Sequence, residues 1–362
     1  MNAQLKADVS GPLALMETVF DAGGQLAAEY PLIFRPGFDG RLVVLEDGDD
    51  VHSSCAVITR RVLLPGVELP IGLIGSVATK STQRGRGHAS QVLSAAERWL
   101  CERGAAIALL WAEDPRFYLA RGYRPIGSEV DAVLDPTVVS ALPCWGLVRA
   151  ATPADAAAIH RLYSTHSSRV DRTADETAAL LRCPRMQVLV AEEAGTPVAY
   201  ACLGRGRDLE NVVHEWAGGT AAALGLFKEA FARSGAQQVV VMAPDDGLAV
   251  IDALATAGAA VHRGFLGLAK VLPGVGPARL IAELLVARGG GQVDVELSSR
   301  DGLSRWRWTG PRGATLLDGA QVLDVLCGPR GVSETLAATR AATGLVATEL
   351  PLKPFVWGLD SI

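Results

Sequence analysis

One glycine-rich stretch, from Arg84 to Ser90 with the sequence RGRGHAS, constrains the fold of this chain most. The apolar segment before it, Ile71 to Thr79, predicts a buried strand whose glycines permit a bulge. The segment after it, Ala89 to Arg103, is rich in Ala, Leu, Glu and Arg and predicts a helix. Two glycines let successive N–H groups converge, and the first helical turn adds unpaired donors and the positive end of its dipole. The arrangement predicts an anion site suited to a diphosphate.

The segments that follow the predicted helix support this interpretation. Gly104 ends the helix, and Ala106 to Ala112 predicts a second buried strand, parallel to the first. Phe117 to Pro125 then predicts a short helix and a turn. Because a glycine-rich turn alone is a weak signal, a solvated loop carrying two arginines stays the alternative for the stretch itself.

This order of segments resembles the GNAT superfamily of acyl-CoA-dependent N-acyltransferases. Arg84-x-x-Gly87-x-Ala89 is similar to the pyrophosphate motif of that family, R/Q-x-x-G-x-G/A, and Phe-Tyr followed by Gly-Tyr is similar to its next segment. The resemblance implies acetyl-CoA as the acyl donor, with no metal. The residues that it assigns to holding acetyl-CoA are Val77, Ala78, Thr79, Arg84, Gly85, Arg86, Gly87, His88, Ala89 and Ser90.

The middle of the chain repeats the plan of the first part without its anion loop. Gly235 to Ala243 matches Gly104 to Ala112 as a buried strand that follows a helix, and only Gly218-Gly219 precedes that helix. Gly204 to Arg207, with the sequence GRGR, has the composition of a phosphate loop but follows the wrong strand, and no helix comes after it. We therefore expect a hairpin turn there, and a second unit that keeps the fold and loses the cofactor.

The last part of the chain predicts a small α+β domain. Ala278 to Ala287 is an amphipathic helix, and Gln292 to Leu297 and Ser304 to Trp308 alternate as a hairpin with buried tryptophans and solvated arginines. Two short helices follow. The chain then ends in an apolar tail, Phe355 to Ile362, which we expect to thread inward and to carry the terminal carboxylate with it.

This plan resembles the enhanced intracellular survival (Eis) family. The resemblance implies an α/β (α+β) fold with two tandem GNAT-like mixed-sheet domains, the second degenerate, followed by a sterol-carrier-like α+β domain with a docked tail. The expected limits are 1–143, 144–272 and 273–362. The family acetylates amines, including aminoglycosides, with a tyrosine as general acid and its own terminal carboxylate as general base, and these match Tyr118 and Ile362. Packing alone stays the alternative role for both residues.

Composition limits the partners. The net charge of −5 argues against nucleic-acid binding, and six scattered cysteines predict neither a disulfide framework nor a metal cluster and fit the cytoplasm. No apolar run is long enough to span a membrane, and the first residues lack the features of a signal peptide.

The predicted function is direct transfer of an acetyl group to a primary amine of a small molecule, such as an aminoglycoside or a polyamine. The alternatives are a lysine acetyltransferase for proteins or peptides and a non-catalytic sensor that binds acyl-CoA or lipid. Self-association into a homo-oligomer is left open.

Overall fold

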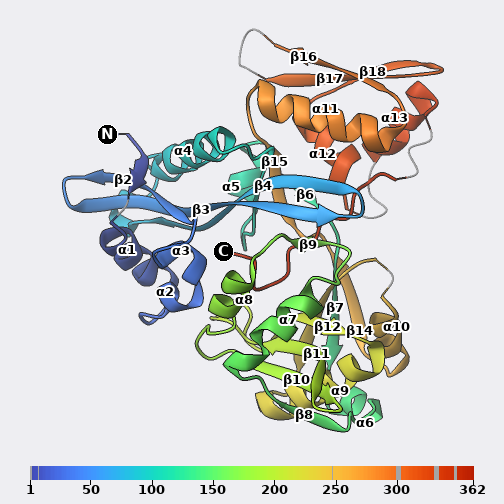
Figure 1. The fold of residues 1–362 in the computed structure, drawn as a ribbon. Helices are drawn as coiled ribbons and strands as arrows, with labels where there is room; N and C mark the ends of the chain where they lie inside the picture. The colour runs from blue at the N-terminus through green and yellow to red at the C-terminus, as the bar shows by residue number, and fades with distance from the viewer. Residues whose placement is uncertain (1, 7, 247, 299–302, 330–333, 346–348) are drawn as a thin grey trace.

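The computed structural model describes the whole chain except residues 1, 7, 247, 299–302, 330–333 and 346–348. Its described residues form three sheets with flanking helices (Figure 1). The first sheet has the order β1-β2-β3-β4-β5-β15-β6, and β9 pairs with β3. Its strands are β1 (Gln4–Lys6), β2 (Arg41–Asp47), β3 (Asp50–Leu64), β4 (Val67–Thr79), β5 (Ile107–Leu110), β15 (Gly267–Val271), β6 (Arg124–Ile126) and β9 (Arg169–Val170). Its helices are α1 (Ser10–Phe20), α2 (Leu26–Glu29), α3 (Pro31–Phe34), α4 (His88–Glu102) and α5 (Arg116–Leu119), with a 3-10 turn at Ser81–Gln83.

The second sheet has the order β14-β7-β13-β12-β11-β10-β8. Its strands are β14 (Ala260–Gly264), β7 (Glu129–Leu134), β13 (Val239–Pro244), β12 (Val212–Gly218), β11 (Thr196–Leu203), β10 (Gln187–Glu193) and β8 (Leu147–Ala150). The helices of this unit are α6 (Pro136–Ala141), α7 (Ala156–Tyr163), α8 (Ala174–Leu180), α9 (Thr220–Ser234) and α10 (Ala249–Thr256), with a 3-10 turn at Pro153–Asp155.

The predicted repeat of the first unit in the second is confirmed. Strand β12 runs parallel to β13 as β4 runs parallel to β5, and a helix of the same length follows each first strand, α9 after β12 and α4 after β4. Helix α9 begins directly after Gly218 and Gly219, so the second unit lacks the loop that the first unit has between Thr79 and α4.

Each of the first two sheets contains a strand from the part of the chain that forms the other sheet. Strand β15 inserts between β5 and β6 of the first sheet, whereas β7 leaves that sheet and pairs with β13 and β14 (Figure 1). The sequence also predicts one complete GNAT-like unit up to about Val139, and this prediction is wrong, because only two residues separate β6 from β7 and the chain crosses between sheets there. The domain limits given above stay a prediction about the chain, and the sheets share strands across the first of them.

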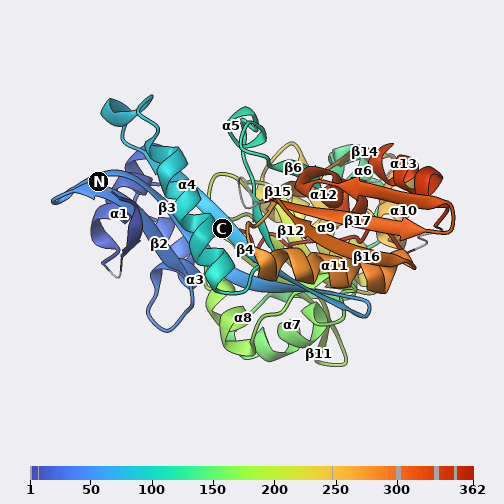
Figure 2. The same ribbon diagram turned by 90° about the horizontal axis from the view of Figure 1, so that it is seen from above.

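The third sheet confirms the predicted hairpin. It has the order β16-β17-β18, and Trp306 and Trp308 of β17 are each 1% exposed. The strand β18 was not predicted, because GATLL is short and barely alternates. Figure 2 shows α11 lying along this sheet at one end of the molecule. The elements are β16 (Gln292–Leu297), β17 (Ser304–Gly310), β18 (Gly313–Leu317), α11 (Val275–Gly289), α12 (Gly319–Cys327) and α13 (Glu334–Thr343).

The C-terminal tail runs inward between the first two units, as predicted (Figure 1). Phe355 and Trp357 are fully buried and Leu359 is 1% exposed, so the tail is part of the core. Among the described residues, no helix combines the length and the apolar character that crossing a membrane requires.

Candidate active site

The predicted anion loop lies on the surface at the start of α4. Gly85 and Gly87 have φ values of 76° and 79°, in the left-handed region that favours glycine, and a side chain at either position would point into open space. Gly87 is the N-cap of α4, and no side chain caps this helix. The first N–H groups of a 15-residue helix are therefore free to bind an oxyanion. The local geometry fits the diphosphate of acetyl-CoA.

Two further side chains border this loop. His88 stacks on His52 of β3, with ring centroids 5.3 Å apart, and burial followed by His52 and Arg86 lowers the pKa of His88. Arg121 donates hydrogen bonds to Ser90 Oγ and, over 2.7 Å, to the Phe117 carbonyl. Arg121 thus ties α4 to the segment after α5. Sequence reasoning missed Arg121 and His52, because neither lies in the glycine-rich motif.

Strand β4 presents a backbone edge next to the loop. Its parallel pairing with β5 joins Ile71–Leu73 to Ile107–Leu109 and stops there, although β4 continues to Thr79. Beyond Leu73, the described structure pairs β4 with β3 alone. A register shift opposite Ser54 and Ala56 accompanies a left-handed Ser76 (φ 49°), which is the predicted bulge. The edge at Val77–Thr79 is therefore suited to pair with the amides of a pantetheine arm.

Tyr118 lies on α5 and packs on the same core cluster as Val77 of β4. It packs edge-on against Phe117 and Tyr123, at 5.0 and 5.8 Å between ring centroids. Burial raises the pKa of Tyr118 to about 12. The hydroxyl of Tyr123 donates to Glu97 over 3.1 Å, whereas the described residues give the Tyr118 hydroxyl no hydrogen-bond partner. Of the two tyrosines, Tyr118 is the one that can donate to a substrate.

The terminal carboxylate lies against Gly75 of β4. A β-carbon at position 75 would lie far inside contact distance of the carboxyl carbon and oxygen of Ile362. Only glycine lets the chain end approach the strand this closely, and Gly75 is two residues before Val77. The structure thus brings Ile362 to the strand that carries the predicted pantetheine edge.

Tyr118 and Ile362 lie on opposite faces of the first sheet. Tyr118 packs on the cluster that contains Val57 and Ile74, whereas Ile362 packs on the cluster that contains Ile58 and Leu73. Because successive side chains of a strand point to opposite faces, the phenol and the carboxylate lie on opposite sides of the sheet, and the carboxylate lies at Gly75, just beyond the last paired residues of β4 and β5. A thioester held at that point would have an acid on one side and a base on the other.

Buried charges anchor the tail that carries the carboxylate. The Tyr163 hydroxyl donates to Asp360 over 2.6 Å, and Arg172 pairs with Asp360 at 3.5 Å and with Glu215 at 2.5 Å. The side chains of Arg172, Glu215 and Asp360 are fully buried. Burial raises the pKa of Asp360 and the pKa of Glu215, and Arg172 opposes both shifts. Sequence reasoning missed this network, because its members are far apart along the chain.

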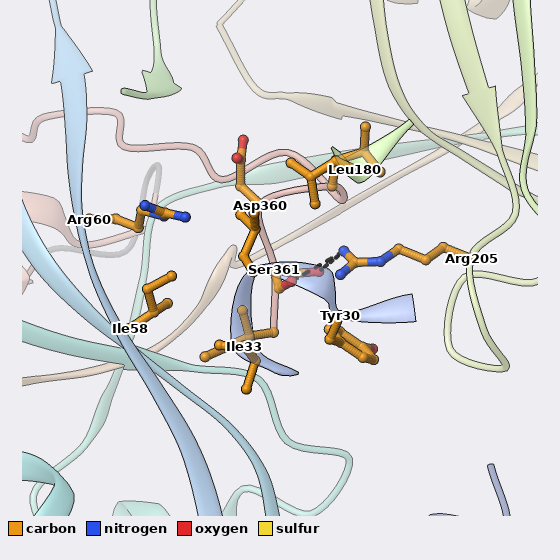
Figure 3. A pocket seen from close by; sticks show the side chains of 11 residues that line it. Tyr30, Ile33, Ile58, Arg60, Leu180, Arg205, Asp360 and Ser361 are labelled. Carbon is orange, nitrogen blue, oxygen red and sulfur yellow. Dashed lines mark hydrogen bonds between the residues drawn. The ribbon is translucent and has the colours of Figure 1, made fainter. Parts of the chain in front are cut away.

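A pocket opens beside the chain end (Figure 3). Arg60, which lines it, pairs with Glu176 at 2.8 Å. The pocket lies on the face of the sheet that Ile362 occupies, and its volume of about 10 Å³ is room for about one water molecule, so it is too small as it stands to hold an amine acceptor. Its lining residues are Tyr30, Leu32, Ile33, Ile58, Arg60, Leu180, Arg205 and the last four residues of the tail.

The sequence predicts that His160 and His166 are ordinary helix-surface residues, and this prediction is wrong for His166. It lies beyond the end of α7, and its ring stacks on Trp357 at 4.2 Å between centroids. Burial, followed by Arg172, lowers the pKa of His166 to about 3. His160 lies on α7 as expected, where its Nδ1 is 2.9 Å from Thr177 Oγ1. The local sequence pattern could not predict this contact, because Trp357 is far from His166 along the chain.

Comparison with known proteins extends these observations. The family model described as an acetyltransferase (GNAT) domain matches residues 3–126. No curated protein matches the chain in sequence.

The solved structures that share the fold at low identity include the following three. A GCN5-related N-acetyltransferase from Anabaena variabilis is 15% identical, with a TM-score of 0.66 and full coverage of both chains. Eis1 from Mycobacterium abscessus is 15% identical, with a TM-score of 0.61 and 98% coverage of both chains. A probable N-acyltransferase from Enterococcus faecalis is 17% identical, with a TM-score of 0.64 over 88% of this chain and 84% of that one.

Proposed function

We propose, from the premise that residues 3–126 are a GNAT acetyltransferase domain, that the chain transfers an acetyl group from acetyl-CoA directly to a primary amine of a small molecule. GNAT domains are acyl-CoA-dependent N-acetyltransferases, and the shared fold extends over the whole chain. Amines of the aminoglycoside and polyamine kind are the first acceptors to test, on the strength of the resemblance to Eis.

The donor would be held by the edge of β4 and the loop before α4. The N–H groups from Arg84 to Ser90 would bind its diphosphate, and the backbone of Val77, Ala78 and Thr79 would pair with its pantetheine amides. Acetyl-CoA would supply an acetyl group activated as a thioester. An N–H group at the bulge of β4 would donate to the thioester oxygen and stabilise the charge that develops there.

The chain's own residues would move two protons. A primary amine is mostly protonated near neutral pH, so the Ile362 carboxylate would accept a proton from the bound ammonium. The freed lone pair on nitrogen would then form the C–N bond to the acetyl carbon as the C–S bond is broken. The Tyr118 hydroxyl would donate to the departing sulfur, so that the products are an amide and a thiol. Proton exchange with water would return the carboxylate and the phenol to their starting states.

One observation carries this proposal: the chain end lies against Gly75, on the opposite face of the sheet from Tyr118, whose hydroxyl has no hydrogen-bond partner among the described residues. A carboxylate has a pKa of roughly 3.5 in water and is a weak base there. A fixed position beside β4 would let it act on the bound ammonium without having to diffuse to it.

Substitution of Tyr118 by Phe tests the acid. We expect kcat/KM to fall about a hundredfold, with unchanged affinity for acetyl-CoA, because the hydroxyl alone is lost. The measurement is thiol release from acetyl-CoA in the presence of an amine. Tyr123→Phe is the matched control, because the Tyr123 hydroxyl donates to Glu97. This variant should retain the native rate and lose about 1 kcal/mol in the free energy of unfolding.

The pH dependence adds a second readout. Because the pKa of Tyr118 is about 12, the phenol stays protonated, and the native rate should not fall between about pH 8 and pH 10. Unchanged kinetics in Tyr118→Phe would remove Tyr118 from the mechanism. A sensor would release no thiol with any amine, and a protein acetyltransferase would prefer lysine peptides to small amines.

A further inference from the structure

Arg205 is a buried arginine in a loop. The segment Gly204–Arg207 begins the loop 204–211 that joins the antiparallel strands β11 and β12, a longer connection than the predicted hairpin turn, and Gly204 and Gly206 have φ values of 76° and 57°. Arg205 is nevertheless 3% exposed. A buried guanidinium requires partners for its N–H groups, because removing the charge from water is costly. The segment whose composition resembles a phosphate loop therefore makes a contact within the protein instead.

The partners of Arg205 belong to the end of the chain and to the first unit. Its Nη1 donates to the carbonyl oxygen of Gly358 and, over 3.1 Å, to that of Ser361. Figure 3 shows the bond between Arg205 and Ser361. Its Nε donates to the Glu29 carbonyl over 3.1 Å, and its guanidinium lies over the Tyr30 ring at 4.4 Å. One side chain of the second unit thus holds the last turn of the tail and rests on α2 and the start of α3.

These contacts bear on the orientation of the terminal carboxylate. The Ser361 carbonyl belongs to the peptide group that precedes Ile362, so its direction sets the direction of the last residue. The other anchor of the tail, Arg172, holds the Asp360 side chain on the path before that peptide group. Without Arg205, the tail would stay tethered at Asp360, and its last two residues would be free to turn.

We propose that Arg205 is a positioning residue, which orients the Ile362 carboxylate so that it can accept a proton from the bound ammonium. This inference rests on the proposed function. Arg205 acts through the backbone of the tail, and its side chain forms part of the pocket beside the chain end. A displacement of a catalytic group by about 1 Å is enough to lower a rate on the order of a hundredfold.

The pH dependence of Arg205→Ala distinguishes positioning from a structural role. With a carboxylate base in place, the bound ammonium can react, and kcat/KM for an alkylamine should change little between about pH 6 and pH 9. Without the base, only the neutral amine reacts, and its fraction rises about tenfold per pH unit. We expect Arg205→Ala to be about a hundredfold slower near neutral pH and to approach the native rate as the pH rises. A deficit that stays constant with pH would overturn the proposal.

Two further measurements test whether Arg205→Ala frees the end of the tail and whether the lost guanidinium is the cause. Carboxypeptidase should release Ile362 faster from Arg205→Ala than from the native chain, and added guanidinium should restore part of the rate. Arg207→Ala is the matched control, because Arg207 lies in the same loop, is exposed and pairs with Asp21 at 2.9 Å. This control should behave like the native chain in every assay. Native-like release of Ile362 from Arg205→Ala would also overturn the proposal.

Two further variants keep the test decisive. If Arg205→Ala fails to fold, Arg205→Lys keeps the charge but loses the planar fork that serves several acceptors at once, and we expect the same pH dependence at smaller amplitude. A chain that lacks Ile362 separates this inference from the proposed function. Full activity of that chain would refute the terminal base itself. Loss of its activity, together with a native pH profile in Arg205→Ala, would refute only the role of Arg205.

Discussion

At Gly75 the absence of a side chain makes room for the end of the chain. A methyl group there would occupy the place of the Ile362 carboxyl group. We therefore expect Gly75→Ala to displace the terminus and to lower kcat/KM about a hundredfold, with little change in affinity for acetyl-CoA. Thiol release and calorimetric titration with acetyl-CoA measure the two effects.

The matched control for Gly75→Ala is the same substitution in a chain that lacks Ile362. The three atoms nearest to the added methyl group all belong to Ile362, so the substitution should cost no further activity in the shortened chain. Equal losses in the two backgrounds would show that Gly75→Ala acts on the strand rather than on the terminus.

At the residue scale, the sequence allowed prediction of what is local. The left-handed glycines of the predicted anion loop, the short helix that carries Tyr118 and the buried tail follow from short patterns, and the structure contains all three, while the roles of these residues stay predictions. The arginines that hold the tail could not be predicted. Arg205 contacts Gly358 across 153 positions and Arg172 contacts Asp360 across 188, and no periodicity in one sequence connects such pairs.

At the scale of elements, the exchange of β7 and β15 makes the first two units depend on each other. A fragment limited to 1–143 lacks β15, whose Leu268 and Ala269 are buried between β5 and β6. It also leaves β7 without its partners β13 and β14. Exposed apolar strand edges favour aggregation. We expect this fragment to show no cooperative thermal unfolding, whereas a fragment of residues 1–272 should unfold cooperatively.

Circular dichroism on both fragments measures this difference. A fragment 1–143 with a cooperative transition and native affinity for acetyl-CoA would contradict the expected dependence. The order and type of nearly all predicted elements agree with the structure, including the helix and parallel strand after the glycine-rich stretch and the hairpin of β16 and β17. The exchange itself was not predictable, since an apolar run predicts a strand but does not identify its neighbours in the sheet.

At the scale of the whole molecule, the second unit holds the end of the chain, which by our proposal supplies the base to the first unit. Trp357 packs against Trp216 and His166, and the Gly358 N–H donates to the His214 carbonyl over 3.0 Å. These residues lie on β12 or close to α7. The second unit, which lacks the glycine-rich loop, thus supports the tail, and the predicted site for the acyl donor is on the first unit.

The charge of the chain end is the centre of this account, and a C-terminal amide at Ile362 tests it most directly. The amide keeps every side chain and replaces the carboxylate by a neutral group of the same size. The measurement is kcat/KM for an alkylamine near neutral pH, by thiol release, in the amidated and the native chain. We predict a loss of about a hundredfold with unchanged binding of acetyl-CoA. An amidated chain that matches the native rate would contradict the account.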